Sequence, residues 1–119
     1  MKRRTLRKTR AAVEAAFHHH VYVVLLNDKA RKFLAGKNPG RGAGKPCVYV
    51  GMTGLTPELR LSNHLAGIKS ARIVQRFGLH LLPELYAHLN PMPFEAAALM
   101  EKDLAEDLKA QGFMVAGGT

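Results

Sequence analysis

The chain has 119 residues, 47% of them hydrophobic, which suits one domain with its own core and excludes a wholly disordered chain. Its longest apolar run covers residues 21–26, far shorter than the roughly 20 residues of a membrane-spanning helix, so a spanning protein is excluded. The single cysteine, Cys47, excludes an internal disulfide, and we expect a cytoplasmic protein.

Positive charge is concentrated in the first part of the chain. Eighteen Lys and Arg residues against nine Asp and Glu give a formal net charge of +9. Residues 1–50 hold 12 basic and 2 acidic residues, a net +10, whereas residues 51–119 hold 6 basic and 7 acidic residues, a net −1. This excess predicts a polyanionic partner. We expect nucleic acid rather than a membrane, because no predicted helix combines a basic face with a large apolar one.

A basic arm precedes the predicted domain. Residues 1–10 carry six positive charges, and residues 11–17 favour a short helix, so we assign 1–17 to an arm and 18–119 to a single domain. Residues 21–26 are apolar on both alternating faces, which predicts a central strand covered on both sides. The three adjacent histidines at 18–20 cannot all face one ion at the start of a strand, so no metal site is expected there.

A long basic connector covers residues 28–46. Its Gly-rich part suggests a phosphate-binding loop, but Pro39 and Pro46 occupy positions where that motif needs Gly and Ser or Thr. A strand, not a helix, is also expected after it. The connector is therefore interpreted either as a loop that touches a phosphate backbone or as a solvated hairpin tip.

Strands and helices alternate in the rest of the chain. Thr56 as N-cap and Pro57 define the start of one helix, and Pro93 and Gly112 bracket another. The predicted elements are a strand at 47–50, a helix at 56–67, a short helix at 70–76, an edge strand at 79–89, a helix at 94–111 and a strand-like segment at 113–115.

The last predicted helix carries a carboxylate within its apolar face. At 100° per residue, Glu101 falls in the middle of a face formed by Phe94, Ala97, Ala98, Leu104, Ala105 and Leu108. Burial of an unpaired carboxylate costs several kcal/mol, so a metal ion, an arginine or an opening to solvent is expected beside it. The alternative is a carboxylate that pairs with a basic neighbour at the rim of the core.

Arg60 and His64 are four residues apart and share one face of the middle helix. The adjacent core stripe is expected to consist of Leu61, Leu65 and Ile68. Arginine supplies bidentate donors and histidine a proton or a donor, so the pair beside the strand that bears Tyr49 suits a phosphate. The alternative is a surface arginine with a histidine at the side of the helix.

The order of these pieces along the chain resembles the GIY-YIG nuclease family. His20-Val21-Tyr22 corresponds to the first motif, with His20 in place of its glycine, and Tyr49-Val50-Gly51 followed by Met52-Thr53 corresponds to the second. Arg60, His64 and Glu101 correspond to the arginine, to a histidine present in some members and to the glutamate. The resemblance spans about residues 20–112. The connector is longer than in many members, and the asparagine often found after the glutamate helix has no counterpart.

The resemblance implies an α/β (α+β) domain with a small three-stranded, mainly antiparallel sheet flanked by helices. It also implies a metal-dependent endonuclease that hydrolyses phosphodiester bonds, with DNA as the expected substrate. Glu101 would hold one divalent cation, Mg²⁺ or Mn²⁺. The motif backbone would be formed at Gly51 and Thr53.

The resemblance assigns the other site residues as well. Tyr22 would help to activate the attacking water, Tyr49 would hydrogen-bond near the scissile phosphate, and Arg60 would neutralise developing charge. His64 is the alternative proton relay. A free tyrosine has a pKa of about 10, so the metal and Arg60 are expected to lower the pKa of Tyr22.

Two other functions remain open from the sequence. One is a noncatalytic nucleic-acid-binding module of the same fold, and the other is a basic RNA- or ribosome-associated protein in which these residues are only structural. Specificity would come from substrate shape, from a protein partner or from a homodimer, or it would be low. The expected phosphate contacts outside the site are Arg3, Arg4, Arg7, Lys37, Arg41, Lys45, Lys69, Arg72 and Arg76.

Overall fold

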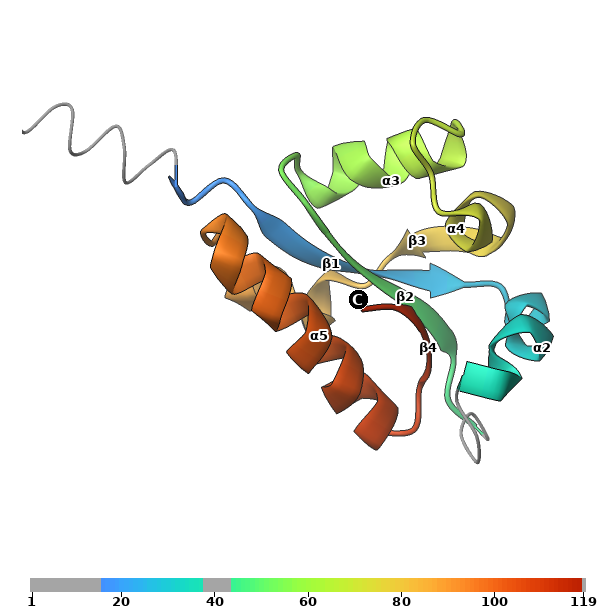
Figure 1. Cartoon of the computed structure of the whole chain (residues 1–119). Coiled ribbons are helices and arrows are strands. Elements are labelled where there is room, and N and C mark those ends of the chain that lie inside the picture. The colour runs from blue at the N-terminus through green and yellow to red at the C-terminus, as the bar shows by residue number, and fades with distance from the viewer. Residues whose placement is uncertain (1–15, 38–43, 119) are drawn as a thin grey trace, which may run out of the picture.

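A four-stranded mixed sheet forms the centre of the protein (Figure 1). The computed structural model describes residues 16–37 and 44–118. The expected phosphate contacts Arg3, Arg4, Arg7 and Arg41, most of the predicted helix at 11–17, and the side chain of Lys37 lie outside this description.

The strands lie in the order β3-β1-β2-β4. Their bounds are β1 His20–Leu26, β2 Cys47–Thr53, β3 Gly78–Leu81 and β4 Met114–Gly117. β1 pairs antiparallel with both β2 and β3, whereas β2 pairs parallel with β4. The expected mixture of helices and strands is confirmed, but the prediction of three strands is wrong. The chain returns through a long helix before it reaches β4, and such a crossover is what places a strand parallel to its neighbour.

β1 is the central strand that the sequence predicted. Its residues from Val21 to Val24 are at most 1% exposed, although their side chains alternate between the two faces of the sheet. The side chain of Asn90 is bound to the start of the strand: its Oδ1 accepts from the Val21 amide at 2.9 Å, and its Nδ2 donates to the Val21 carbonyl at 2.7 Å. β1 is thus fixed where Tyr22 projects.

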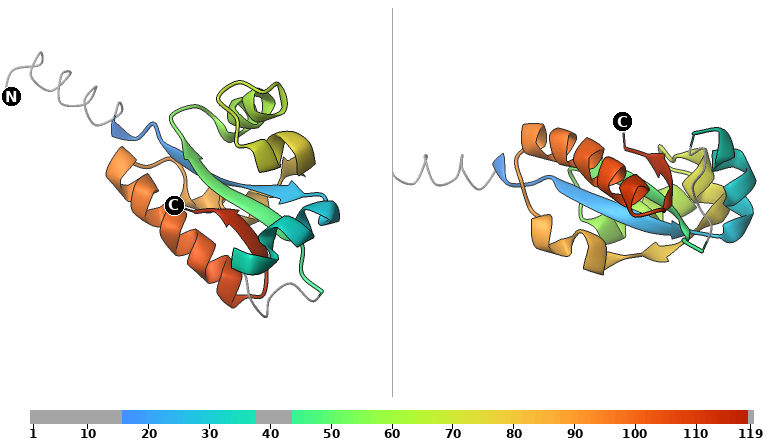
Figure 2. Two further views of the ribbon diagram at one scale, coloured as in Figure 1. Left: turned by 45° about the vertical axis from the view of Figure 1, so that its right-hand side comes forward. Right: turned by 90° about the horizontal axis from the view of Figure 1, so that it is seen from below.

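Four α-helices surround the sheet (Figure 2), as far as the described residues go. They are α2 Arg31–Leu34, α3 Pro57–Leu65, α4 Arg72–Phe77 and α5 Phe94–Ala110. α5 lies along β2 and β4, whereas α3 and α4 contact each other and also β1 and β3. The start of α3 is as predicted, because the Thr56 Oγ1 accepts from the Leu59 amide at 3.2 Å.

Several predicted bounds are wrong. Part of the connector is helical, since η1 Asp28–Ala30, α2 and η2 Ala35–Lys37 follow one another. The expected edge strand at 79–89 is limited to β3, because Pro83 starts the first of two short 3-10 helices, η3 Pro83–Leu85 and η4 Ala87–Leu89. β2 continues through Gly51 to Thr53, three residues beyond the predicted end of the strand at residue 50.

The buried face of α3 differs from the predicted one. Leu65 and Ile68 are 45% and 54% exposed, whereas Pro57 and His64 are buried. Pro57 and His64 are seven residues apart, which is two turns, so they lie on the same side of the helix. His64 turns inward because its ring nitrogens have partners inside the protein. No described helix is long and apolar enough to cross a membrane.

Candidate functional site

Three aromatic side chains from three elements meet beside the sheet: Tyr22 of β1, Tyr49 of β2 and His64 of α3. Their ring centroids are 6.2 Å apart for the two tyrosines, 6.1 Å for Tyr22 and His64, and 5.6 Å for Tyr49 and His64. Tyr22 is 1% exposed and His64 is fully buried, whereas Tyr49 is partly open to solvent. Tyr49 is therefore the member of the cluster that is most accessible from solvent.

The hydrogen bonds of His64 define its tautomer. The amide of Ala71 donates to His64 Nδ1 at 3.0 Å, and an amide N–H can only donate, so Nδ1 is the acceptor nitrogen. The proton of the neutral ring is then on Nε2, which lies 2.8 Å from the Tyr22 Oη. Burial, followed by the charge of Arg60, lowers the pKa of His64 to about 4, so the ring is neutral at pH 7. His64 therefore donates its one N–H to Tyr22.

Burial controls the acidity of both tyrosines. It raises the pKa of Tyr22 well above its usual value, helped by Tyr49 and Glu101, while Arg60 lowers it by charge and hydrogen bonding. Burial also raises the pKa of Tyr49, with Glu101 adding to the effect and Arg60 and the Tyr22 hydroxyl opposing it. Arg60 alone therefore does not lower the pKa of Tyr22 below its usual value, because desolvation of the phenolate outweighs the nearby arginine; the lowering expected from Arg60 together with a metal stays a prediction.

The side chain of Arg60 is fixed by backbone carbonyls. Its Nη2 donates to the carbonyl of Lys69 at 2.7 Å, and its Nη1 donates to that of Ile68 at 3.3 Å. Lys69 has a φ of +47°, a left-handed conformation that is uncommon for residues other than glycine. Arg60 and Lys69 line an open groove of about 360 Å³, together with Thr53, Leu55, Asn63 and Ile68. The groove thus offers two cations to an anion that approaches Arg60.

Glu101 projects from α5 and is half-buried. Burial raises the pKa of the Glu101 carboxyl group, while a hydrogen bond from the Gly118 backbone and the charge of Lys102 oppose this rise. The negative charge of Glu101 in turn raises the pKa of both tyrosines. Among the described residues no Lys, Arg or His lies within ion-pair distance of Glu101. The cation expected beside it from the sequence is therefore not an arginine of the described chain.

The donor set around Glu101 is compatible with one weakly held hard cation. Mg²⁺ keeps several waters and is often held by one or two carboxylates together with substrate phosphates, so a single carboxylate beside a phosphate site fits it. The described residues include no group of three His, Cys, Asp or Glu side chains that could hold a metal ion on their own. A cation here would depend on oxygen atoms from the substrate.

Two glycines make room for the tyrosines. Gly51 lies opposite Tyr22 in the β1–β2 ladder, and a Cβ added there would be 2.5 Å from the Tyr22 Oη. Gly117 has a φ of +74°, and a Cβ there would be 2.9 Å from the Tyr49 ring. The C-terminal Gly-Gly pair was not predicted as part of the site. Gly117 is the last residue of β4, and a glycine within a strand is a sequence signal for a close backbone approach.

The predicted phosphate contacts do not all gather at the site. Lys69 lies in the Arg60 groove, and Arg72 and Arg76 are exposed on α4. Lys45 lies elsewhere, with its Nζ 5.2 Å from the ring centroid of Phe113. Of the described predicted contacts, only Lys69 thus lies with Arg60, while Arg72 and Arg76 lie on the neighbouring helix α4.

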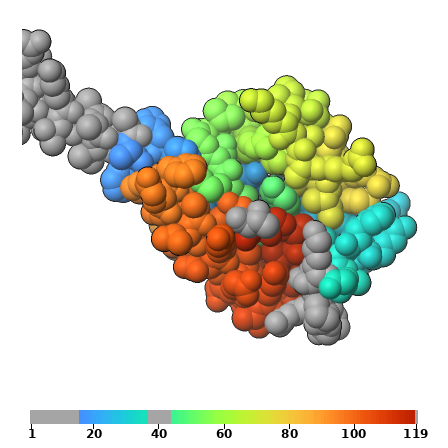
Figure 3. Space-filling model, in the orientation of Figure 1, coloured from blue at the N-terminus to red at the C-terminus, as the bar shows by residue number. Residues whose placement is uncertain are grey.

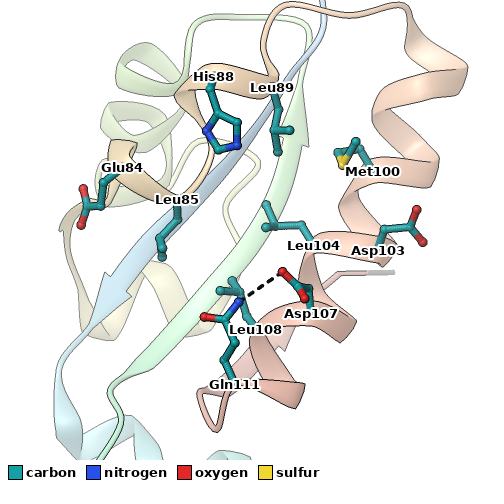
Figure 4. A pocket seen from close by; sticks show the side chains of 10 residues that line it. All are labelled: Glu84, Leu85, His88, Leu89, Met100, Asp103, Leu104, Asp107, Leu108 and Gln111. Carbon is teal, nitrogen blue, oxygen red and sulfur yellow. Dashed lines mark hydrogen bonds between the residues drawn. The ribbon is translucent and has the colours of Figure 1, made fainter.

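A larger groove, of about 520 Å³, lies between η3, η4 and α5 (Figure 4). Leucines and Met100 form its apolar part, while Glu84, Asp103 and Asp107 stand around it. It contains none of the candidate catalytic, metal-binding or phosphate-binding residues predicted from the sequence, although Leu104 and Leu108 of the predicted apolar face line it. Its carboxylates disfavour the binding of a polyanion.

Searches against protein-family models, curated proteins and solved structures found no match to this chain.

Proposed function

We propose that the protein is a metal-dependent phosphodiesterase of the GIY-YIG type that cuts the backbone of a nucleic acid, with DNA as the expected substrate. The observation that carries the proposal is the hydrogen bond of 2.8 Å between Tyr22 and His64. This hydrogen bond connects Tyr22, in the segment that resembles the first GIY-YIG motif, to the helix that bears Arg60, although the two residues are 42 positions apart in the sequence. A mere pair of core aromatics would not require the adjacent arginine, the second tyrosine or the unpaired carboxylate.

His64 acts as a positioning residue in this proposal. Its Nδ1 accepts from the backbone and its Nε2–H donates to Tyr22, so the neutral ring has no free lone pair for a substrate proton. Of the two proton acceptors left open by the sequence, the hydrogen bonds therefore favour Tyr22. The N–H of His64 stabilises the phenolate form of Tyr22 and holds its oxygen in place.

The hydrolysis follows from these roles. The oxygen of a water forms a bond to phosphorus, the bond from phosphorus to one sugar oxygen breaks, and that oxygen takes a proton from solvent. The proton of the attacking water passes to the Tyr22 phenolate, Tyr49 hydrogen-bonds the phosphate, and Arg60 stabilises the charge on its oxygens. Because burial keeps Tyr22 protonated at neutral pH, we expect the rate to rise about tenfold per pH unit above pH 7.

Glu101 is the residue that would hold the divalent cation. A cation held there supplies Lewis-acid polarisation of the phosphate and favours ionisation of nearby groups. The raised pKa of the free carboxyl group and its lack of an ion-pair partner among the described residues support this assignment.

Nicking of supercoiled plasmid and of branched DNA, with Mg²⁺, Mn²⁺ or EDTA, tests the proposal. We expect metal-dependent nicking that is lost in Tyr22→Phe, Arg60→Ala and Glu101→Ala. Tyr86→Phe is the matched control, because Tyr86 is also buried, at 2% exposed, but its hydroxyl has no partner in the described structure. Nicking that survives Tyr22→Phe, or that is lost equally in Tyr86→Phe, would refute the proposal.

A noncatalytic nucleic-acid-binding module is the second candidate. The observation that favours it is the burial of Tyr22, which leaves 1% of the residue open to solvent. It predicts salt-sensitive binding without cleavage, unaffected by Tyr22→Phe. The two candidates also differ in linkage, because only a true cation site predicts that Mg²⁺ raises the melting temperature of the wild type but not of Glu101→Ala.

A further inference from the structure

An aromatic and basic surface outside the tyrosine site joins α2 to α4. The rings of Phe33 and Phe77 lie 5.6 Å apart between centroids. The guanidinium of Arg76 is 4.9 Å from the Phe77 centroid and 5.5 Å from that of Phe33, and the Lys32 ammonium is 5.2 Å from Phe33. We call this surface the α2–α4 patch, and its members are Lys29, Lys32, Phe33, Arg72, Arg76 and Phe77.

The patch has the composition of a binding surface. Phe33 is 50% exposed, so a large ring stays in contact with water in the protein alone. Hollows of about 200 and 260 Å³ adjoin the two rings, and the four cations around them are exposed. The nearby carboxylate, Asp28, is engaged by the Arg31 guanidinium at 2.6 Å. The patch thus combines a half-exposed aromatic ring with positive charge.

The patch is connected to the tyrosine site through α4. Ala71, the N-cap residue of this helix, donates its amide to His64, and Phe77 at its other end accepts from the Asn27 amide at 2.7 Å. Figure 3 shows the surfaces of α2 (cyan) and α4 (yellow-green) side by side on the face that also carries α3. A strand that lies along α4 would therefore lead from the patch toward Arg60.

We propose that the α2–α4 patch binds an unpaired stretch of nucleic acid, with a base stacked on Phe33 and the adjacent phosphates bound by Lys29, Lys32, Arg72 and Arg76. Proteins that bind single strands combine aromatic stacking platforms with basic grooves in this way. In a duplex the base faces are covered by their neighbours, so a stacking ring selects unpaired bases. The proposal rests on the proposed function only in taking nucleic acid as the partner, and it needs no cleavage.

The chain contains no tryptophan, which allows a local fluorescence test. Phe33→Trp places a single indole on the patch, and Phe94→Trp is the matched control, because Phe94 is 56% exposed but lies at the start of α5. Both variants are made in the full chain and titrated with oligothymidine and with a mixed-sequence duplex in EDTA, so that nothing is cut. Binding is followed in parallel by fluorescence anisotropy of the labelled oligonucleotide.

We expect oligothymidine to quench Phe33→Trp strongly, duplex to quench it much less, and neither to quench Phe94→Trp. We also expect Phe33→Ala to weaken binding of oligothymidine about tenfold and Phe33→Tyr to retain it. Absence of binding, unquenched Phe33→Trp at saturation, equal quenching at both positions or equal quenching by duplex would each overturn the proposal. Because EDTA prevents metal-dependent cleavage in this assay, binding at the patch can be observed even if the nicking experiment fails. Likewise, a failure of binding at the patch does not contradict a positive nicking experiment.

Discussion

The close contact between Gly51 and Tyr22 predicts that Gly51→Ala is strongly destabilising. A Cβ at position 51 would lie 2.5, 2.6 and 2.9 Å from the Oη, Cζ and Cε1 atoms of Tyr22. Real Cβ atoms essentially never come this close to another heavy atom. The ring cannot move aside cheaply, because Tyr22 is buried in a central strand and its hydroxyl is bound to His64.

The cost follows from two effects. Overfilling a packed core costs about 1–3 kcal/mol, and a His64 Nε2–H that loses its partner inside the protein adds about 1–3 kcal/mol. Since a partial shift of the ring relieves some of the first effect, we expect a loss of about 3 kcal/mol. For a chain of this size that corresponds to a fall in melting temperature of roughly 10 °C.

Thermal and urea unfolding of Gly51→Ala, followed by circular dichroism, measures this cost. Gly36→Ala is the matched control, because a Cβ at Gly36 would have no heavy atom within 4 Å, and we expect a change within about 0.5 kcal/mol. In a Tyr22→Leu background, which lacks the three contacted atoms, the added methyl group should cost much less. A Gly51→Ala variant as stable as Gly36→Ala, or an equal cost in both backgrounds, would refute the reasoning.

Three further predictions concern His64, Glu101 and the N-cap residue Thr56. The pKa of His64 is about 4 in the folded protein and near 6.5 in the unfolded chain. Between these pH values the unfolded chain binds a proton that the folded protein does not. The free energy of unfolding therefore falls as the pH drops from 6.5 toward 4, by up to about 3 kcal/mol. A His64→Asn variant should lack that share of the slope in denaturant titrations at several pH values. Glu101→Gln should abolish nicking. It should also leave the melting temperature at pH 7 equal or higher, because desolvation disfavours the half-buried carboxylate of the wild type. A clear fall in melting temperature would contradict this expectation. Thr56→Ala should cost about 1 kcal/mol through loss of the N-cap of α3 and leave nicking unchanged below the melting transition, which unfolding curves and the plasmid assay check together.

Helix ends were predictable because they depend on neighbouring residues. Thr56 and Pro57 start α3, and Pro93 and Gly112 flank α5, through local hydrogen bonds and restricted φ angles that act within a few residues. The central position of β1 was predictable for a similar reason, since its two apolar faces can be read from consecutive residues.

The geometry of the candidate site was predictable only in part. The sequence singled out Glu101 from helical periodicity and paired Arg60 with His64 from their spacing, and the structure brings these residues near the two tyrosines. It could not predict that Leu65 and Ile68 face solvent, because the rotation of α3 is decided by the partners of His64 on other elements. The contact of the Ala71 amide with His64 could not be predicted either, because a backbone N–H is present at every residue except proline and leaves no pattern in the sequence.

The sequence by itself determined the basic character of the chain, its central strand, its two capped helices and the types of residue that meet at the site. Each of these depends on composition or on contacts between residues close in the chain. Only the tertiary structure decided the parallel pairing of β4 with β2, the tautomer of His64 and the meeting of Phe33 with Phe77. These depend on contacts between segments far apart in sequence, where packing of the whole domain selects one arrangement.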